Sequence, residues 1–249
     1  MRIVTPQSRE LTGGSLFCGI DTAIESAKAW GNEVSIVEPF ACPAVDELRK
    51  VYEHHSPNGF LFERWCFEQW LYMPTWIDHC GGGTVFKADS DVLIFANVAK
   101  VLEDGADITR EINPFFHGYI NKETALRISD GILDAFRNGT AETQCARTGG
   151  HVADMFLIPA IFGLDCRAGH PIRESLFDLN LYETCGEPDF EGHKDIRFVA
   201  GQPYWVRNSG DAKMLSIHCW GKAKRRMPAI WEQAKASTRG APVRLTIGQ

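Results

Sequence analysis

Two carboxylates one residue apart, Asp89 and Asp91, are the side chains of this chain whose spacing most directly suggests chemistry. They follow an apolar, β-prone run at residues 84–88 and precede a second one at residues 92–95. A hard divalent cation held by one or two carboxylates usually completes its shell with water and phosphate oxygens. The pattern therefore predicts a metal–diphosphate site, and the alternative is an acidic turn between two strands.

A histidine and a basic run lie far downstream, at the end of an apolar strand predicted at residues 214–218. A neutral imidazole, here that of His218, is a good ligand for manganese. Gly221 allows a backbone to approach a phosphate closely. The following cations suit a diphosphate: Lys222, Lys224, Arg225 and Arg226. Alone, this motif would indicate a core histidine and a solvated basic run; its pairing with the two aspartates favours a binding site.

The elements that must position these residues begin as a strand, a helix and a strand, at residues 2–5, 15–30 and 33–37. A β-α-β opening implies a parallel sheet with a right-handed crossover. An aromatic helix at residues 62–70 is predicted to belong to the core. Other helices are predicted at residues 44–55, 95–103, 122–138, 152–162 and 228–236. A polar tail is expected after the last of them.

The bulk composition limits the class of protein. The chain has 249 residues, of which 44% are hydrophobic, with a net charge of -6, and its pI is about 5.8. An acidic chain argues against a general nucleic-acid binder. The 8 cysteines show no C-x-x-C pair and are typical of a reducing compartment. No stretch is long and apolar enough to span a membrane, so we expect a cytoplasmic protein, with peripheral membrane contact left open.

Asp89-Ser90-Asp91 followed by His218-x-x-Gly221-x-x-Lys224 resembles the motif pair of glycosyltransferase family 8, which includes glycogenin and bacterial lipopolysaccharide galactosyltransferases. The resemblance implies an α/β fold of the GT-A type over residues 1–249: one domain with a mixed, mostly parallel sheet flanked by helices. Residues 1–110 would form the nucleotide-binding half and residues 111–249 the acceptor side.

The same resemblance implies an activity. The enzyme would transfer a hexose from a nucleotide-sugar, with UDP as the expected nucleotide, to a saccharide or another hydroxyl acceptor, with retention of configuration. Asp89, Asp91 and His218 would bind Mn²⁺ (or Mg²⁺), while Gly221 and Lys224 would contact the diphosphate. Ser90 lies within the motif and is expected beside the donor.

Further candidates follow from their places in the chain. Thr5 and Gln7 end the first strand, where such enzymes contact the nucleobase. Donor contacts are also expected from Arg64, Gly118 and Asn121. Asp154, opening a helix near His151, is the candidate for stabilising the reacting carbon or for accepting a proton. His151 is expected in the acceptor cleft. Alternatively, Asp154 is an acid favoured by a helix dipole and Arg64 a surface arginine.

Two other functions fit parts of the pattern. A nucleotidyltransferase or nucleotide-sugar pyrophosphorylase would carry a glycine-rich, basic signature after the first strand, but residues 6–14 offer only Gly13, Gly14 and Arg9. A non-catalytic GT-A-like domain that binds a partner or a glycan would not need Asp89, Asp91 and His218 together. A glycosyltransferase is therefore the preferred interpretation.

Overall fold

The computed structural model describes residues 1–8, 19–103, 117–145, 151–163, 179–183, 194–208 and 210–247. Most of the loop predicted at residues 6–14, the start of the helix predicted at residues 15–30, and much of the irregular stretch after residue 164 lie outside these ranges. Within them, no helix combines the length and the apolar character needed to cross a membrane.

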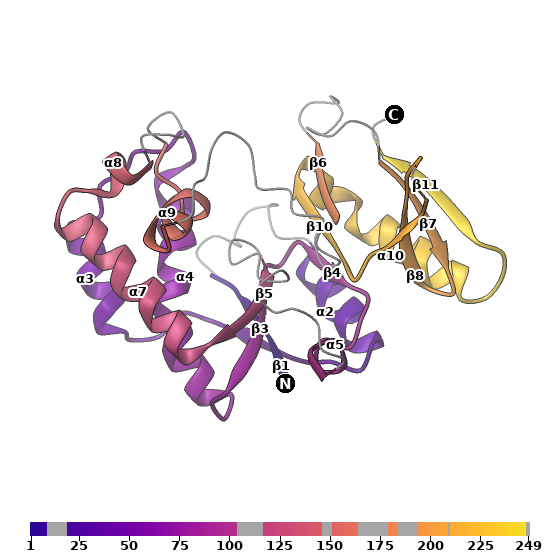
Figure 1. Ribbon diagram of the computed structural model, residues 1–249, viewed down its shortest axis with the longest axis horizontal. Coiled ribbons are helices and arrows are strands. Elements are labelled where there is room, and N and C mark those ends of the chain that lie inside the picture. Colours follow the sequence, from indigo (N-terminus) through magenta and orange to yellow (C-terminus); the bar gives the residue numbers. More distant parts are fainter. Residues whose placement is uncertain are drawn as a thin grey trace.

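The described strands form three sheets (Figure 1). The first has the order β2-β1-β3-β5, with β1 parallel to β2 and β3, and β5 antiparallel to β3. The second has the order β4-β10-β6 and the third the order β11-β7-β8-β9. Their bounds are β1 Arg2–Pro6, β2 Glu33–Val37, β3 Thr84–Ala88, β4 Val92–Ile94, β5 His117–Asn121, β6 Leu179–Glu183, β7 Lys194–Val199, β8 Gln202–Val206, β9 Ala212–Lys213, β10 Ser216–Gly221 and β11 Val243–Ile247.

Helices alternate with the strands of the first sheet, as the sequence predicts. Their bounds are α2 Ile20–Ala29, α3 Pro43–Val51, α4 Phe60–His79, α5 Val98–Glu103, α7 Lys122–Arg137, α8 Ala141–Cys145, α9 Asp154–Ile161 and α10 Met227–Ser237, with a 3₁₀ helix, η3, at Lys222–Arg226. The predicted α/β class, with a mixed and mostly parallel sheet flanked by helices, is confirmed for this sheet.

Alternation along the strands of the first sheet builds a core on each of its faces. Val4, Val85 and Ile120 pack with residues of α3, α4, α7, α8 and α9. Ile3 and Phe86, their neighbours in sequence, pack on the opposite face with residues of α2 and α5. Because successive side chains of a strand point to opposite faces, the register of β1 against β3 fixes both cores at once.

Helix α4 is the central element on one face of the sheet. The sequence predicts a helix at residues 62–70, and the structure extends it to 20 residues. Trp70, Tyr72 and Met73 are almost wholly buried, which fits a helix that is apolar on most of its circumference. The aromatic residues are core residues, as predicted, while Glu63 and Glu68 are also buried and require partners.

The third sheet packs with α10 away from the first sheet (Figure 1). Ile196 and Phe198 of β7 contact the buried face of α10, which includes Ile230 and Ala234. The polar tail predicted after residue 236 is wrong, because Val243–Ile247 is β11 and pairs with β7 in an antiparallel register. Its sequence alternates apolar residues with the polar Arg244 and Thr246, which is the pattern of a strand.

The contact between α7 and α9 depends on a glycine. A Cβ at Gly131 would lie 2.7 Å from Cγ2 of Ile161 in α9. We expect Gly131→Ala to lower the free energy of unfolding by about 1 kcal/mol, because overpacking outweighs the better helix propensity of alanine. Urea unfolding measures the change. Adding Ile161→Ala should lower the free energy of unfolding less in Gly131→Ala than in the wild type. A Gly131→Ala variant that is more stable than the wild type would contradict the contact.

Candidate active site

The Asp89-Ser90-Asp91 segment forms a tight turn between the first and second sheets. It leaves the carboxyl end of β3 and enters β4, and the amide of Val92 donates to the carbonyl of Asp89 at 3.2 Å. The parallel strand β1 ends at the same edge, so Thr5, which is buried, and Gln7 lie on that side of the sheet. Ligands of open α/β sheets bind at this carboxyl edge.

Strand β5 brings one predicted donor residue to this edge and not the other. Gly118 lies opposite Lys87 in the antiparallel register of β3 and β5. Asn121 lies opposite Thr84, at the other end of β3, and its side chain caps α7 by accepting from the amide of Thr124 at 2.8 Å. The structure therefore places Asn121 away from Asp89, in a helix-capping position.

Strand β10 brings His218 to Asp91. It pairs antiparallel with β4, with His218 opposite Val92, and the amide of Cys219 donates to the carbonyl of Asp91 at 2.8 Å. Nε2 of His218 lies 3.4 Å from Oδ1 of Asp91. Two motifs that are far apart in sequence thus meet through one pair of strands, as the sequence analysis requires of a shared site.

Lys224 completes this group from η3. Its Nζ lies 2.9 Å from Oδ2 of Asp91. Burial alone would raise the pKa of Asp91, but the charges of Lys224 and His218 outweigh it and hold that pKa below its ordinary range. Burial lowers the pKa of Lys224, and the Asp91 carboxylate more than reverses this, so that pKa is raised. Asp91 is therefore a buried anion shared by two basic groups.

Gly221 sits between His218 and Lys224 where the chain leaves β10. Its backbone has φ 60° and ψ −129°, a combination that side chains rarely adopt. The residue is exposed. Glycine adopts this turn without strain, and the turn leads into η3, from which Lys224 reaches Asp91. The side chain of Lys222 lies outside the described residues.

Asp89 is bound by Lys87, a residue that was not among the predicted site residues. Nζ of Lys87 lies 2.5 Å from Oδ1 of Asp89, and the Lys87 side chain is 0% exposed. The same ammonium lies 4.7 Å from the ring centre of Trp70 in α4, a cation–π contact. Lys87 shares the face of β3 that Val85 presents to α4. A charged residue in the otherwise apolar run at residues 84–88 was the available signal.

Asp154 lies on the far side of Trp70, at the start of α9. The indole Nε1 of Trp70 donates to Oδ2 of Asp154 at 3.0 Å, and the amide of Met155 donates to Oδ1 at 2.8 Å. Burial, then the charge of Glu63, raises the pKa of Asp154 to about 7. Trp70 thus connects Asp154 to Lys87 and Asp89, and the carboxyl can exchange a proton near neutral pH.

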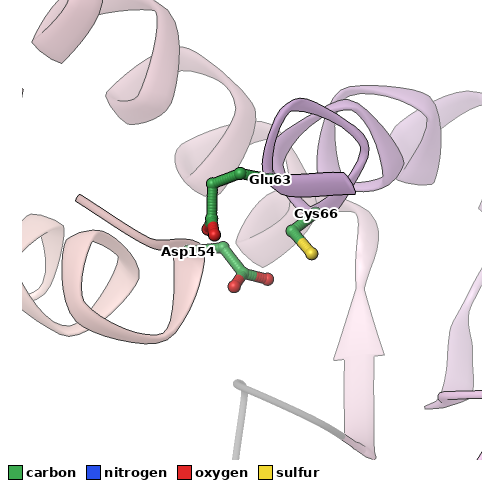
Figure 2. A group of neighbouring side chains, drawn as sticks. All are labelled: Glu63, Cys66 and Asp154. Carbon is green, nitrogen blue, oxygen red and sulfur yellow. The ribbon is translucent and has the colours of Figure 1, made fainter. Parts of the chain in front are cut away.

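Glu63 and Cys66 face Asp154 from α4 (Figure 2). Glu63, Cys66 and Trp70 stand at positions i, i+3 and i+7 of α4, so all three lie on one side of the helix. A ligand atom from each of Glu63, Cys66 and Asp154 lies within 4.8 Å of the others, the one such group of three among the residues that the structure describes. Burial, then the charge of Asp154, raises the pKa of the Cys66 thiol well above its ordinary value. The group could hold a cation or share a proton.

His151 joins this group through a serine. The hydroxyl of Ser56 donates to Oε2 of Glu63 at 2.8 Å and lies 2.7 Å from Nε2 of His151. The side-chain amide of Asn58 donates to the same Glu63 oxygen at 2.7 Å. The two residues predicted for catalysis, His151 and Asp154, are therefore connected through Ser56 and Glu63.

Arg64 makes its contacts elsewhere on α4. Its Nε lies 2.9 Å from Oε1 of Glu68, and its guanidinium lies 5.3 Å from the ring centre of Phe60. Glu68 is also bound through both oxygens by Arg49. These contacts tie α4 to α3, and they give Arg64 a structural role on this helix.

No family model matches the chain, and no curated protein does. Among solved structures, the chain is similar to mouse xyloside xylosyltransferase 1 in its apo form, with 11% identity and a TM-score of 0.44 over 73% of this chain and 87% of that one. It is also similar to galactosyltransferase LgtC in complex with donor and acceptor sugar analogues, with 12% identity and a TM-score of 0.46 over 93% and 95%. Identities this low do not carry a function across.

The predicted metal ligands fit a divalent cation in type and only partly in arrangement. Carboxylate oxygens and an imidazole suit Mn²⁺, and Asp91 and His218 already lie side by side. Asp89 instead turns to Lys87. Among the described residues, Asp89, Asp91 and His218 do not converge within 4.8 Å as a set of three. A cation could join Asp91 and His218 here, with Asp89 nearby.

Proposed function

We propose that the protein is a glycosyltransferase that moves a hexose from a nucleoside-diphosphate sugar, with UDP as the expected nucleotide, to a hydroxyl acceptor. The observation that carries the proposal is the buried Asp91, bound by both His218 and Lys224 next to Gly221, whose positive φ suits glycine alone. A basic residue and an open backbone beside a buried carboxylate form a place where a diphosphate and a cation can be bound together.

The diphosphate side of the reaction would use Lys224 and the Gly221 backbone. As the sugar–phosphate bond breaks, negative charge grows on the departing diphosphate, and an ammonium group in a partly buried site stabilises it. Lys224 has a side-chain exposure of 22%, so it can reach both Asp91 and a ligand. A divalent cation bound at Asp91 and His218 would add Lewis-acid stabilisation of the same oxygens.

The sugar side of the reaction would use Asp154. As a carboxylate it would stabilise positive charge at the anomeric carbon, which favours retention of configuration; as a base it would take the acceptor proton. Trp70 would hold Asp154 in place, and Ser56 would hold His151 beside Glu63. Thr5, Gln7 and Gly118 would border the nucleotide and the donor sugar at the edge of the first sheet.

Nucleotide binding tests the proposal. We expect one of UDP, GDP and CDP to raise the melting temperature by about 5 °C in the presence of Mn²⁺, which corresponds to a ligand at roughly 100 times its Kd. The shift should disappear in Asp91→Ala because the central anion is lost. Differential scanning fluorimetry measures it.

The matched control is Asp78→Ala, which removes an exposed aspartate that pairs with Lys122 and should leave the shift intact. A melting temperature that no nucleotide changes, or a shift that persists in Asp91→Ala, would overturn the assignment. Binding without hydrolysis or transfer of the matching nucleotide-sugar would favour a non-catalytic domain instead.

A further inference from the structure

Each aspartate of the Asp89-Ser90-Asp91 turn already carries a lysine from the same chain. Lys87 is bound to Asp89 at 2.5 Å and Lys224 to Asp91 at 2.9 Å. With the imidazole of His218 neutral, the two carboxylates and the two ammonium groups balance in charge before any ligand arrives. A divalent cation entering on its own would leave this neutral group with two uncompensated positive charges in a partly buried site, which is unfavourable.

The two lysines differ in their freedom to move. Lys87 is 0% exposed and its ammonium is held over the ring of Trp70, between β3 and α4. Lys224 is 22% exposed and extends from the short helix η3. The first can leave Asp89 only if the core between β3 and α4 opens, whereas the second can turn from Asp91 to a nearby ligand by rotating its own side chain.

We propose that this site takes up a divalent cation and a diphosphate together, with Lys224 as a counter-ion that passes from Asp91 to the diphosphate and Lys87 as one that stays on Asp89. The diphosphate diester of a nucleotide-sugar brings two negative charges, which balance the two of the cation, and the free nucleotides used as probes bring about one more. The joint complex therefore adds no net positive charge to the site. Lys87 is then a positioning residue that keeps the affinity for the cation alone low. The inference rests on the proposed function and names its ligand as a metal–diphosphate complex.

Isothermal titration with Mn²⁺, with and without UDP, GDP or CDP, tests the inference on the whole chain. In the wild type, we expect the nucleotide to tighten Mn²⁺ binding at least about thirtyfold, within the usual range of coupling between sites. Lys224→Met should tighten the binding of Mn²⁺ alone at least about fivefold and weaken the enhancement by nucleotide. Lys87→Met should also tighten the binding of Mn²⁺ alone but should keep the enhancement.

The control is Lys100→Met, an exposed lysine on α5, which should change none of these affinities. The inference is overturned if the wild type binds Mn²⁺ equally tightly with and without nucleotide. It is also overturned if the affinity for Mn²⁺ alone is unchanged or weaker in both Lys87→Met and Lys224→Met. If Lys87→Met does not fold, Lys224→Met alone decides, because its lysine reaches solvent. Failure of every nucleotide to bind would sink the proposed function, whereas nucleotide binding with unaltered Mn²⁺ affinities would sink only the counter-ion roles.

Discussion

Replacing Asp154 with asparagine is expected to stabilise the protein increasingly as the pH rises from 4.5 to 8. In the folded protein, burial and the charge of Glu63 raise the pKa of Asp154 to about 7, whereas in the unfolded chain the value is about 3.9. A raised pKa contributes stability below the ordinary value, and that stability is lost as the pH climbs through the folded value. Asparagine has no charge to bury and can still accept from Trp70.

The advantage of Asp154→Asn should grow by about 2 to 3 kcal/mol between the two pH values, since one pKa unit corresponds to about 1.4 kcal/mol. Urea unfolding at pH 4.5 and pH 8 measures it. Asp130→Asn, at an exposed position of α7, serves as the matched control and should show no such trend. An equal difference in the free energy of unfolding at both pH values would mean that the carboxyl does not titrate in this range.

The rate of sugar transfer by Asp154→Asn should fall at least about a hundredfold if Asp154 is the acid–base group.

Asp91→Asn is expected to lower the free energy of unfolding by about 3 kcal/mol at pH 7, because it leaves the largely buried ammonium of Lys224 without its anion. Lys224 and His218 both lie against this carboxylate. The pKa of Asp91 is held below its ordinary range after the charges of these two groups overcome the effect of burial. The stability it contributes is therefore present above about pH 4 and lost as the pH falls further.

Chemical unfolding across the pH range measures this effect. The difference in free energy of unfolding between wild type and Asp91→Asn should become smaller below about pH 4. Adding Lys224→Met to Asp91→Asn should recover part of the lost free energy of unfolding, because it removes the uncompensated ammonium group. The exposed pair Asp78–Lys122 gives the control: Asp78→Asn should cost less than about 1 kcal/mol. An equal cost at both positions would show that Asp91 is not an essential buried anion.

The strands of the first sheet and the proximity of the Asp89-Ser90-Asp91 turn to His218 could be predicted from the sequence. The apolar, β-prone runs at residues 84–88 and 92–95 are short-range signals, and the resemblance of the motifs supplied the long-range one. Which strand carries His218 beside Asp91 follows from the pairing of β10 with β4. Periodicity alone cannot give that pairing, because it specifies faces and not neighbours.

The remainder of the site depends on tertiary contacts that no local pattern encodes. Lys87 was overlooked because one charged residue in an apolar strand indicates burial only when its partner is known, here Asp89 with Trp70 behind it. Asn121 was expected at the donor, but its place is set by the antiparallel direction of β5. Likewise β11 escaped notice because its edge pairing with β7 does not require a strongly apolar segment.

The pairing of β10 with β4 has a consequence for synthesis on the ribosome. Asp91 acquires His218 and Lys224 only when the chain through η3 has emerged, whereas Asp89 has Lys87 from the beginning. A nascent chain that ends before β10 therefore carries one aspartate already compensated and one without its basic partners. Contacts of such high sequence separation form late, so the charged surroundings of Asp91 are complete only after η3 has left the ribosome and β10 has paired with β4.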